Sequence, residues 1–330
     1  MGDVAMMLPA LLCLKMQYNV TVTVVSRPMF APIFKDTGIN FFPVDLTNRH
    51  NGLIGIYKLY KDLRRLNISA VADLHQVIRS KILGTLFLLT GIPVSSINKG
   101  RKEKKALTRL SNKVYKPLKH TVLRYAEVFS KLGFDLDLEH FNPVPQNSSE
   151  EVTNVYGPKI EKWLGIAPFA QHSGKVYPID LMQEVVNELS KMPCKLFLLG
   201  GNNEKVLLKQ LTNQLPNAIV VAGNLTFEQE LTLIAALDVM LSMDSANGHL
   251  AANFGVPVVT LWGATHPYAG FAPYGQPTAN SLMPDLSKFP ALPTSVYGNK
   301  MIPGYEDVMR TIPPSEVVQK VWQIANQTSS

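Results

Sequence analysis

The stretch DVMLSMDSANGHLAANFGVPVVTLWGATHP, residues 238–267, holds one complete strand–helix–strand unit. Its first apolar run, residues 238–243, predicts a short strand, and residues 245–254 predict a helix that ends at Gly255. Residues 256–262 are almost wholly apolar and predict a second strand, buried on both faces. A strand–helix–strand unit joins parallel strands through a right-handed crossover, so we expect an α/β protein.

The turn between the first strand and the helix has the composition of an anion-binding site. It holds Asp244, Ser245, Ala246, Gly248 and His249. A helix N-terminus offers unpaired backbone N–H groups and the positive end of a dipole, which suits a diphosphate. The small residues at 245–248 would let a ligand approach the backbone closely. The same pattern also fits an ordinary α/β unit in which Asp244 caps the helix.

The rest of the chain repeats this alternation of strands and helices, which favours doubly wound parallel sheets. The expected strands lie at 20–25, 41–44, 70–74, 163–169, 194–199 and 218–222, and the expected helices at 53–66, 79–89, 179–190 and 313–327. A helix near residues 8–12 would carry Pro9 in its first turn, where proline is tolerated. Thr226 and Gln229 match a capping box at the start of a further helix.

Two widely separated motifs resemble those of glycosyltransferase family 9, which contains the ADP-heptose:lipopolysaccharide heptosyltransferases. The run D-S-A-N-G-H-L-A-A, followed by G-V-P-V-V-T-L-W-G, resembles the family signature, with Ala246 where the family usually has Gly. The run G-D-V-A-M-x-L-P-A-L at residues 2–11 is similar to the family's N-terminal motif. Residues 73–75 with Arg79, and the segment 120–133, are looser matches, so the resemblance covers nearly the whole chain.

The resemblance implies a GT-B architecture, in which two Rossmann-like domains face a central cleft. A length of 330 residues also predicts two domains. The polar, proline-containing stretch 142–149 places their boundary. We expect an acceptor-binding domain over residues 1–145 and a nucleotide-sugar-binding domain, ending in a helix, over residues 146–330.

One departure from the family concerns the first strand of the N-terminal domain. Family members begin with an apolar strand just ahead of the G-D motif, whereas this sequence begins at Met1, Gly2 and Asp3. That strand is central in a doubly wound sheet, so its loss leaves two neighbours without a partner. We expect the strand to be encoded ahead of Met1, and a natural deletion is the alternative.

An inverting sugar transfer needs a base for the acceptor hydroxyl and stabilisation of the departing nucleotide diphosphate. The resemblance assigns the base to Asp3, for which a helix cap is the structural alternative. It assigns Lys175, which precedes Tyr177-Pro178, to neutralising the diphosphate without a metal ion. Glu204 matches a ribose-binding acid, and Asp244 would face the sugar and the diphosphate.

The remaining donor-binding residues implied by the resemblance are Ser245, Ala246, Gly248 and His249. We expect no metal site, because His172 and His266 have no cysteine or carboxylate at ligand spacing. We expect no cofactor either, since the nucleotide sugar is a substrate. The sequence contains neither G-x-G-x-x-G nor G-x-x-x-x-G-K-[ST], which counts against NAD enzymes and P-loop ATPases.

The net charge of +7 is concentrated in residues 99–119. We expect Lys102, Lys104 and Lys105 to bind an anionic, lipid-linked oligosaccharide acceptor, and a solvated helix face is the alternative. No aromatic ladder accompanies these lysines, so nucleic acid is not an expected partner. Two cysteines far apart in the sequence favour a reducing compartment, and no apolar run is long enough to span a bilayer.

We therefore expect a cytoplasmic bacterial enzyme of lipopolysaccharide and cell-envelope biosynthesis, in peripheral contact with the inner face of the cytoplasmic membrane. It would be an inverting, metal-independent glycosyltransferase that moves a heptose or similar sugar from an ADP-sugar to a lipopolysaccharide core acceptor. Two alternatives stay open. The chain could be a GT-B transferase with another nucleotide-sugar donor, or a non-catalytic nucleotide-sugar-binding relative truncated at its N-terminus.

Overall fold

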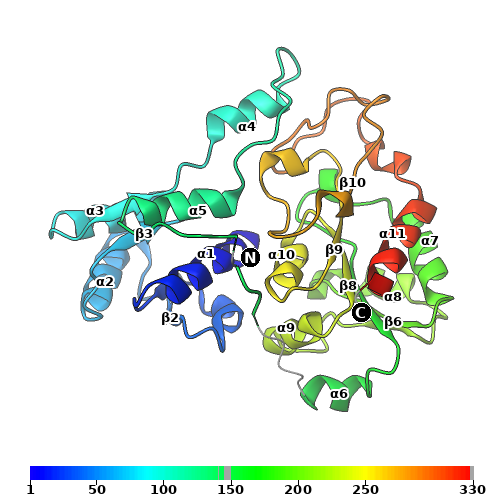
Figure 1. Ribbon diagram of the computed structural model, residues 1–330, viewed down its shortest axis with the longest axis horizontal. Helices are drawn as coiled ribbons and strands as arrows, with labels where there is room; N and C mark the ends of the chain where they lie inside the picture. Colours follow the sequence, from blue (N-terminus) through cyan, green and yellow to red (C-terminus); the bar gives the residue numbers. More distant parts are fainter. Residues whose placement is uncertain (140, 145–149, 328–330) are drawn as a thin grey trace. The chain divides into compact units, whose positions relative to one another are not determined.

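The computed structural model describes residues 1–139, 141–144 and 150–327 (Figure 1). The chain divides into two compact units. The first unit comprises Met1, Asp3–Gly100 and Lys119–Asn142, and the second comprises Gly2, Arg101–Leu118 and Pro143–Ser330. The boundary expected between residues 145 and 146 lies outside the described residues, as do residues 146–149 of the polar stretch.

The second unit contains a six-stranded sheet, in the order β10-β9-β8-β5-β6-β7, in which every pairing is parallel. Its strands are β5 (Lys162–Ala167), β6 (Cys194–Leu198), β7 (Ala218–Val220), β8 (Val239–Met243), β9 (Val258–Leu261) and β10 (Ser281–Leu282). The strands β8 and β9 confirm the two expected within residues 238–262. Both are buried along their whole length, as their apolar runs predict.

Helices cover both faces of this sheet. In Figure 1, α7 (Ile179–Ser190), α8 (Lys205–Leu211) and α11 (Pro314–Gln327) lie on one side of it, and α9 (Phe227–Ala235) and α10 (Ala246–Asn253) lie on the other. The sheet and these helices enclose one large apolar core. The unit also contains α4 (Arg101–Thr108), α6 (Glu150–Tyr156) and the short 3-10 segments η2 (Ser173–Lys175), η3 (Asn202–Glu204), η4 (Pro267–Ala269), η5 (Thr278–Asn280) and η6 (Val308–Thr311).

Local sequence signals set several helix ends in the second unit. The N-cap of α9 is Thr226, whose hydroxyl accepts the Gln229 backbone N–H while the Gln229 side chain accepts the Thr226 N–H. The predicted capping box is therefore confirmed. Helix α7 follows Pro178 directly and has the bounds expected from the sequence. Its buried stripe, which includes Met182 and Leu189, packs into the core.

The strands of the first unit form two separate parallel pairs. Strand β1 (Thr23–Ser26) pairs with β2 (Asn40–Pro43), and β3 (Val71–Asp73) pairs with β4 (Val94–Ser96). Within the described part of this unit, no strand joins β1 to β3. A doubly wound sheet without its central strand would be split in this way.

Helix α1 (Gly2–Gln17) differs from the sequence expectation, because it begins at Gly2 and carries Pro9 in its interior. The prediction of Pro9 in a first turn is therefore wrong. Proline removes one backbone hydrogen bond from a helix interior. Burial of Leu8, Leu11 and Leu14 offsets that cost by anchoring the helix on either side of the proline. Asp3 does lie in the first turn, where the family motif predicts an acid.

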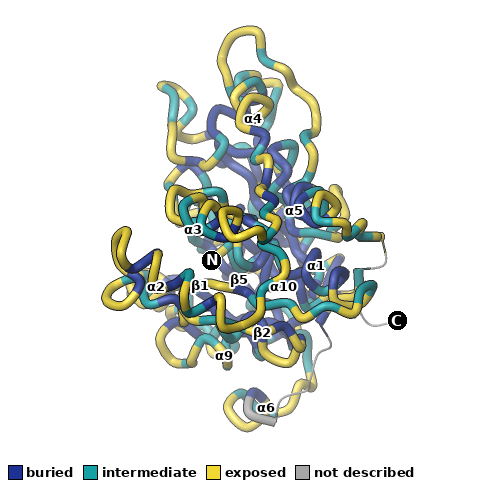
Figure 2. The backbone as a smooth tube through the Cα atoms, turned by 90° about the vertical axis from the view of Figure 1, so that its left-hand side faces the viewer, coloured by how far each residue is buried: buried dark blue, intermediate teal, exposed yellow. Residues whose placement is uncertain are grey.

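Three further helices, α2 (Gly52–Arg64), α3 (Ile78–Leu88) and α5 (Thr121–Ser130), surround the strand pairs of the first unit, which also contains the 3-10 segment η1 (Pro28–Phe34). Val44, Leu59, Leu63 and Phe87 form a buried cluster that joins α2 and α3 to the end of β2. Figure 2 shows buried and exposed residues alternating along α2, as expected of a helix with one packed face.

Candidate functional site

A buried ion pair lies where the order of strands in the second unit reverses. The chain runs from β5 to β6 and β7 on one side, and later returns to place β8 on the other side of β5. Lys175 follows β5 and Asp244 follows β8, and the Lys175 Nζ lies 3.3 Å from the Asp244 Oδ2. Their side chains are 14% and 8% exposed. Open α/β sheets bind ligands at such a switch point, outside the carboxyl ends of the strands.

Helix α10 begins beside this ion pair. Its N-cap is Ser245, but the Ser245 hydroxyl does not cap the helix and instead lies 3.0 Å from the Ser242 hydroxyl. The Ser245 side chain therefore leaves the backbone N–H groups of the first turn, which starts at Ala246, without a cap. The positive end of α10 is suited to phosphate oxygens, and the Lys175–Asp244 ion pair stands next to it.

Gly248 and His249 are buried within α10. A Cβ atom added to Gly248 would lie 3.2 Å from Pro273 and 3.4 Å from both Ser242 and Val258. The absence of a side chain at Gly248 therefore lets the helix pack closely against the rest of its unit.

The Glu204 carboxylate lies at the end of η3, after β6. Its Oε2 accepts the backbone N–H of Gly201 at 2.6 Å, so the acid closes its own turn. A Cβ on Gly200 would lie 2.7 Å from the same oxygen, so a larger residue there would require the Glu204 carboxylate to move. The second carboxylate oxygen of Glu204 remains a potential acceptor for ligand hydroxyls.

Gly298 contacts the Lys175 side chain, a contact that the sequence did not predict. Its φ of +76° suits glycine, and an added Cβ would lie 2.2 Å from the Lys175 Cγ. Gly174, next to Lys175, is packed as tightly, because an added Cβ would lie 2.7 Å from the Gly298 carbonyl oxygen. These two glycines fix the course of the lysine stem. A glycine remote in sequence gives no signal of this contact.

In the first unit, Asp3 lies near a histidine. The Nε2 of His75 is 3.6 Å from the Asp3 Oδ2, and both side chains are more than half exposed. Asp73, at the end of β3, holds the turn that carries this histidine. Its Oδ1 accepts the backbone N–H groups of His75 and Gln76, and its Oδ2 accepts the Ser80 hydroxyl. The D-L-H motif is thus a turn that presents His75 to Asp3.

Residues 101–118, which hold most of the basic segment, belong to the second unit. Lys102 and Lys105 are exposed on α4, but Lys104 is only 6% exposed. The Lys104 ammonium lies 4.0 Å from the centroid of the Phe271 ring, a cation–π contact. Lys104 therefore anchors α4, and the exposed charge of the helix comes from its neighbours. Beyond α4, the turn at residues 109–112 is exposed (Figure 2).

The remainder of this segment is anchored by polar contacts. Lys113 donates to the carbonyls of Ala291 and Pro293, and burial lowers the pKa of its ammonium to about 8. Burial, with a smaller effect of the Lys113 charge, lowers the pKa of His266 to about 4, so this imidazole is neutral near pH 7. The His266 Nδ1 accepts the Tyr268 backbone N–H, so its Nε2 carries the proton and donates to the Tyr115 hydroxyl at 2.9 Å.

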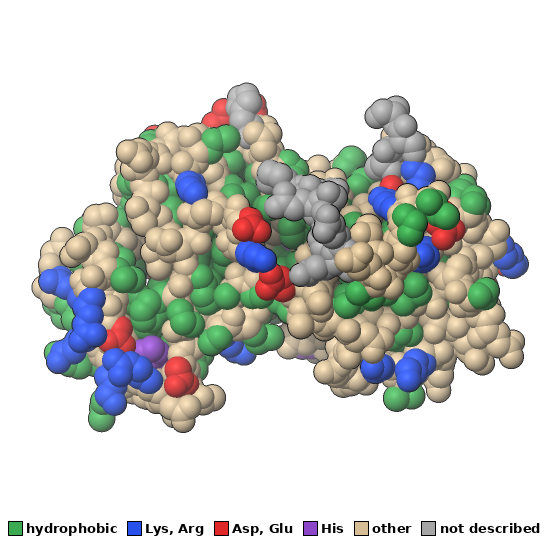
Figure 3. Space-filling view, turned by 90° about the horizontal axis from the view of Figure 1, so that it is seen from below, with side chains coloured by type: hydrophobic (Ala, Val, Ile, Leu, Met, Phe, Trp, Pro, Cys, Tyr) green, Lys and Arg blue, Asp and Glu red, His purple; other side chains and the backbone are tan. Residues whose placement is uncertain are grey.

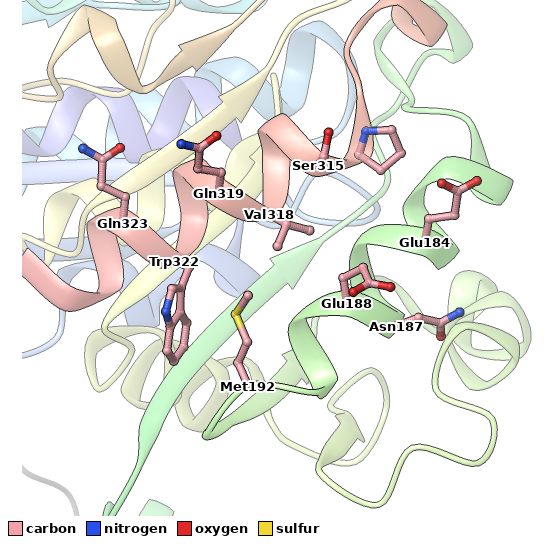
Figure 4. Close-up of a pocket in the computed structure, with 10 residues that line it drawn as sticks. Glu184, Asn187, Glu188, Met192, Ser315, Val318, Gln319, Trp322 and Gln323 are labelled. Atoms are coloured by element: carbon pink, nitrogen blue, oxygen red, sulfur yellow. The ribbon is translucent and has the colours of Figure 1, made fainter.

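A separate groove of about 690 Å³ lies between α7 and α11. Figure 4 shows Met192 and Trp322 side by side in it, with Glu184 and Glu188 along the α7 side. Neither the predicted base nor any residue predicted to bind the donor or the acceptor lines this groove.

The described residues contain no group of three or more His, Cys, Asp or Glu side chains placed to hold a metal ion. A search of the same residues finds no helix long and apolar enough to cross a membrane.

Comparison with known proteins finds one matching family and several solved structures of similar fold. The sequence model of glycosyltransferase family 9 (heptosyltransferase) matches residues 56–300. No curated protein sequence matches this chain. Among solved structures, a family 9 glycosyl transferase from Veillonella parvula has a TM-score of 0.73 at 16% identity, with 99% of this chain and 94% of that chain covered.

Two Escherichia coli structures are also similar. ADP-heptose lipopolysaccharide heptosyltransferase II has a TM-score of 0.68 at 17% identity, and heptosyltransferase WaaC, solved with ADP, has a TM-score of 0.64 at 18% identity. Each alignment covers 99% of this chain and 96% of the other. These similarities confirm the predicted mixed α/β, GT-B type of fold.

Proposed function

Because this chain belongs to glycosyltransferase family 9, the heptosyltransferase family, we propose that it transfers a heptose or a closely similar sugar from an ADP-sugar to a lipopolysaccharide core oligosaccharide, with inversion at the anomeric carbon. The observation that carries the proposal is the Lys175–Asp244 pair beside the N-terminus of α10, at the switch point of the second sheet. The presence of ADP in one E. coli relative, and of ADP-2-deoxy-2-fluoro heptose in another structure of the same enzyme, supports the choice of donor.

The chemistry requires two kinds of group. A base takes the proton of the acceptor hydroxyl as its oxygen attacks the anomeric carbon, and the bond from that carbon to the diphosphate oxygen breaks. Negative charge then grows on the departing ADP and must be stabilised. We assign the base to Asp3, with His75 as the group that orients it, and the charge stabilisation to Lys175 and the first turn of α10.

The Asp244 carboxylate neutralises Lys175. The ion pair therefore holds the Lys175 side chain in one place. We propose that the Lys175 ammonium turns toward the diphosphate on binding while Asp244 accepts from sugar hydroxyls. Ser245 and Ala246 supply backbone N–H groups, Gly248 and His249 hold α10 in place, and Glu204 binds the ribose hydroxyls.

Calorimetric titration with ADP and with the ADP-sugar tests the donor site. Lys175→Met should weaken the binding of ADP, and Asp244→Asn the binding of the intact ADP-sugar, each by about 10- to 150-fold, the loss expected when a charged hydrogen bond in a desolvated site is removed. Asp238→Asn is a matched control, because Asp238 pairs with Lys159 and Lys162 at the amino ends of the same two strands. Unchanged affinity in both site variants would refute the assignment, and equal binding of UDP would refute the choice of ADP.

The base is tested by Asp3→Asn. The variant should lower kcat by about 10²- to 10⁴-fold, the usual contribution of general base catalysis, with ADP affinity unchanged. Asp36→Asn is the control, because Asp36 is an exposed acid of the same unit whose φ of 58° asparagine also accepts. A kcat within twofold of wild type for Asp3→Asn would show that Asp3 is only a helix-terminal acid.

We also propose that the reaction needs no divalent cation, because Lys175 and the α10 N-terminus supply the positive charge that a metal would otherwise bring to the diphosphate. Activity should therefore survive dialysis against EDTA. A loss of activity that magnesium restores would contradict this part of the mechanism.

For the acceptor, we propose that the exposed lysines of α4 attract the anionic oligosaccharide. Reversal of Lys102 and Lys105 to Glu should raise the acceptor KM and flatten its dependence on salt, because exposed charges act through a screened field. Lys131→Glu with Lys209→Glu is the control, since both lysines are exposed and the net charge changes equally. Lys104 is omitted because its buried contact with Phe271 would confound the result with folding. Unchanged acceptor kinetics would make α4 a solvated face.

A further inference from the structure

The outward face of α2 carries an unusual set of side chains for a helix that packs against its own unit. Leu53, Ile54 and Tyr57 are 72%, 74% and 49% exposed, respectively. The buried side of the same helix is occupied by Ile56, Leu59 and Leu63. Apolar residues thus line both the packed face of α2 and the first part of its exposed face. Packing within the unit therefore accounts for the buried apolar residues of α2 but not for the exposed ones.

The rest of the exposed face is basic. It presents the side chains of Lys58, Lys61, Arg64 and Arg65. At 3.6 residues per turn, these four and the three exposed apolar residues fall within about 140° of the helix circumference. The face is therefore one continuous strip, apolar in its first turns and cationic in its last turns. Lys61 lies 5.0 Å from the centroid of the Tyr57 ring, where the two parts meet.

No carboxylate of α2 interrupts this strip. The one acid of the helix is Asp62, whose side chain is 13% exposed and is bound by Arg49 and His50. Arg65 lies 3.9 Å from Asp62, too far for a strong ion pair. Figure 3 shows Lys and Arg side chains gathered at its left-hand end, with hydrophobic, acidic and His side chains beside them.

We propose that the α2 strip, defined as Leu53, Ile54, Tyr57, Lys58, Lys61, Arg64 and Arg65, docks the protein on an anionic lipid bilayer. Aliphatic and aromatic side chains bordered by lysines and arginines fit the boundary between acyl chains and acidic headgroups. Long basic side chains can keep their charges at the headgroups while the apolar residues insert. The negative potential of an anionic leaflet attracts such basic groups. A partner protein would have to supply both an apolar pocket and an acidic surface, and the bilayer has both properties without a specific fold.

This inference goes beyond the sugar-transfer proposal, and its test contains neither donor nor acceptor. Cosedimentation would be measured with vesicles of phosphatidylcholine alone and with added phosphatidylglycerol. The wild-type protein should bind the anionic vesicles and release them at high salt. Leu53→Ser with Ile54→Ser, and separately Lys58→Glu with Lys61→Glu, should each lower the partition coefficient by about tenfold or more.

Matched controls separate an effect of α2 from a general effect of lower surface hydrophobicity or lower net charge. Ile160→Ser with Val206→Ser removes two aliphatic side chains of the second unit that are 87% and 68% exposed. Lys131→Glu with Lys209→Glu reverses two exposed lysines outside α2. Both controls should bind vesicles within twofold of wild type. Far-UV circular dichroism would check that each variant is folded. If one of the two α2 variants does not fold, the other α2 variant provides the test.

Three outcomes would overturn the proposal. These are equal binding of neutral and anionic vesicles, full vesicle binding by both α2 variants, and losses in the controls as large as those in the α2 variants. Unchanged ADP affinity in the α2 variants is expected in every case, so a failure here leaves the proposed function standing.

Discussion

The two units of this protein use the same alternation of strands and helices but complete it differently. The second unit has an unbroken parallel sheet of six strands, with β5 and β8 paired at its centre. The first unit has two parallel pairs, β1–β2 and β3–β4, and within its described residues no strand joins them. Both strands of an isolated pair are edge strands, whereas only two of the six strands in the second unit lie at an edge.

The difference shows where each unit obtains its stability. In the second unit, the central strands are buried on both faces, so the sheet and its covering helices share one core. In the first unit, the pairs depend on the helices packed against them and on polar links such as the Asp62 network. Isolated two-stranded pairs are marginally stable by themselves. We therefore expect the first unit to unfold more readily than the second.

The largest predicted effect is at the centre of the six-stranded sheet. Leu241, in β8, is fully buried, and Leu241→Ala should lower the free energy of unfolding by about 3–5 kcal/mol. The three tryptophans, Trp163, Trp262 and Trp322, all belong to the second unit, so tryptophan fluorescence in urea reports this unit alone. A large shift of the midpoint is expected. A loss below about 1 kcal/mol would show that the sheet centre is not the main source of stability.

The matched change in the first unit is Leu59→Ala, on the buried face of α2. Its cost should be about 2–3 kcal/mol, because the small cluster with Leu63 and Phe87 can relax around the cavity. Urea unfolding followed by far-UV circular dichroism should show an early transition that this variant shifts, while the tryptophan transition stays in place. Coincident shifts of both signals would show that the two units unfold as one.

A smaller effect is expected from Asp62→Asn. The carboxylate accepts two hydrogen bonds from Arg49 at 2.8 Å and contacts His50, and these bonds lower the pKa of Asp62 to about 2. Because the folded pKa is depressed, the stabilisation is present above pH about 4 and is lost as pH falls toward 2. The variant should cost about 1–2 kcal/mol at neutral pH and almost nothing at the acid end. A pH-independent difference would assign the loss to packing.

The smallest effect is expected in the second unit, from Glu230→Gln. Burial raises the pKa of Glu230 to about 7. The unfolded chain therefore loses this proton first, and stability falls as pH rises from about 4.5 to about 7. The isosteric amide removes that penalty, so it should raise stability by up to about 1 kcal/mol above pH 7 and leave it unchanged below pH 4.5. Thermal unfolding of both proteins across this pH range is the measurement, and a gain at low pH would contradict it.

Much of the fold could be read from the sequence because its signals are local. The apolar runs of β8 and β9, the capping box at Thr226 and the bounds of α7 depend on residues close to one another in the chain. The interior position of Pro9 in α1 could not be read this way. A local rule ends a helix at proline, whereas burial of the flanking leucines keeps this one continuous.

In the candidate site, too, some features follow from local sequence and others only from tertiary contacts. The sequence alone determined that Lys175 and Asp244 each follow a strand, because periodicity locates strand ends. That the two side chains pair, that Gly298 packs against Lys175, and that Lys104 is buried on Phe271 were decided only by the tertiary structure. These contacts join residues far apart in the chain, and their existence depends on the order in which the strands assemble. Periodicity and motif spacing carry no information about that order, so only the folded sheet brings such residues together.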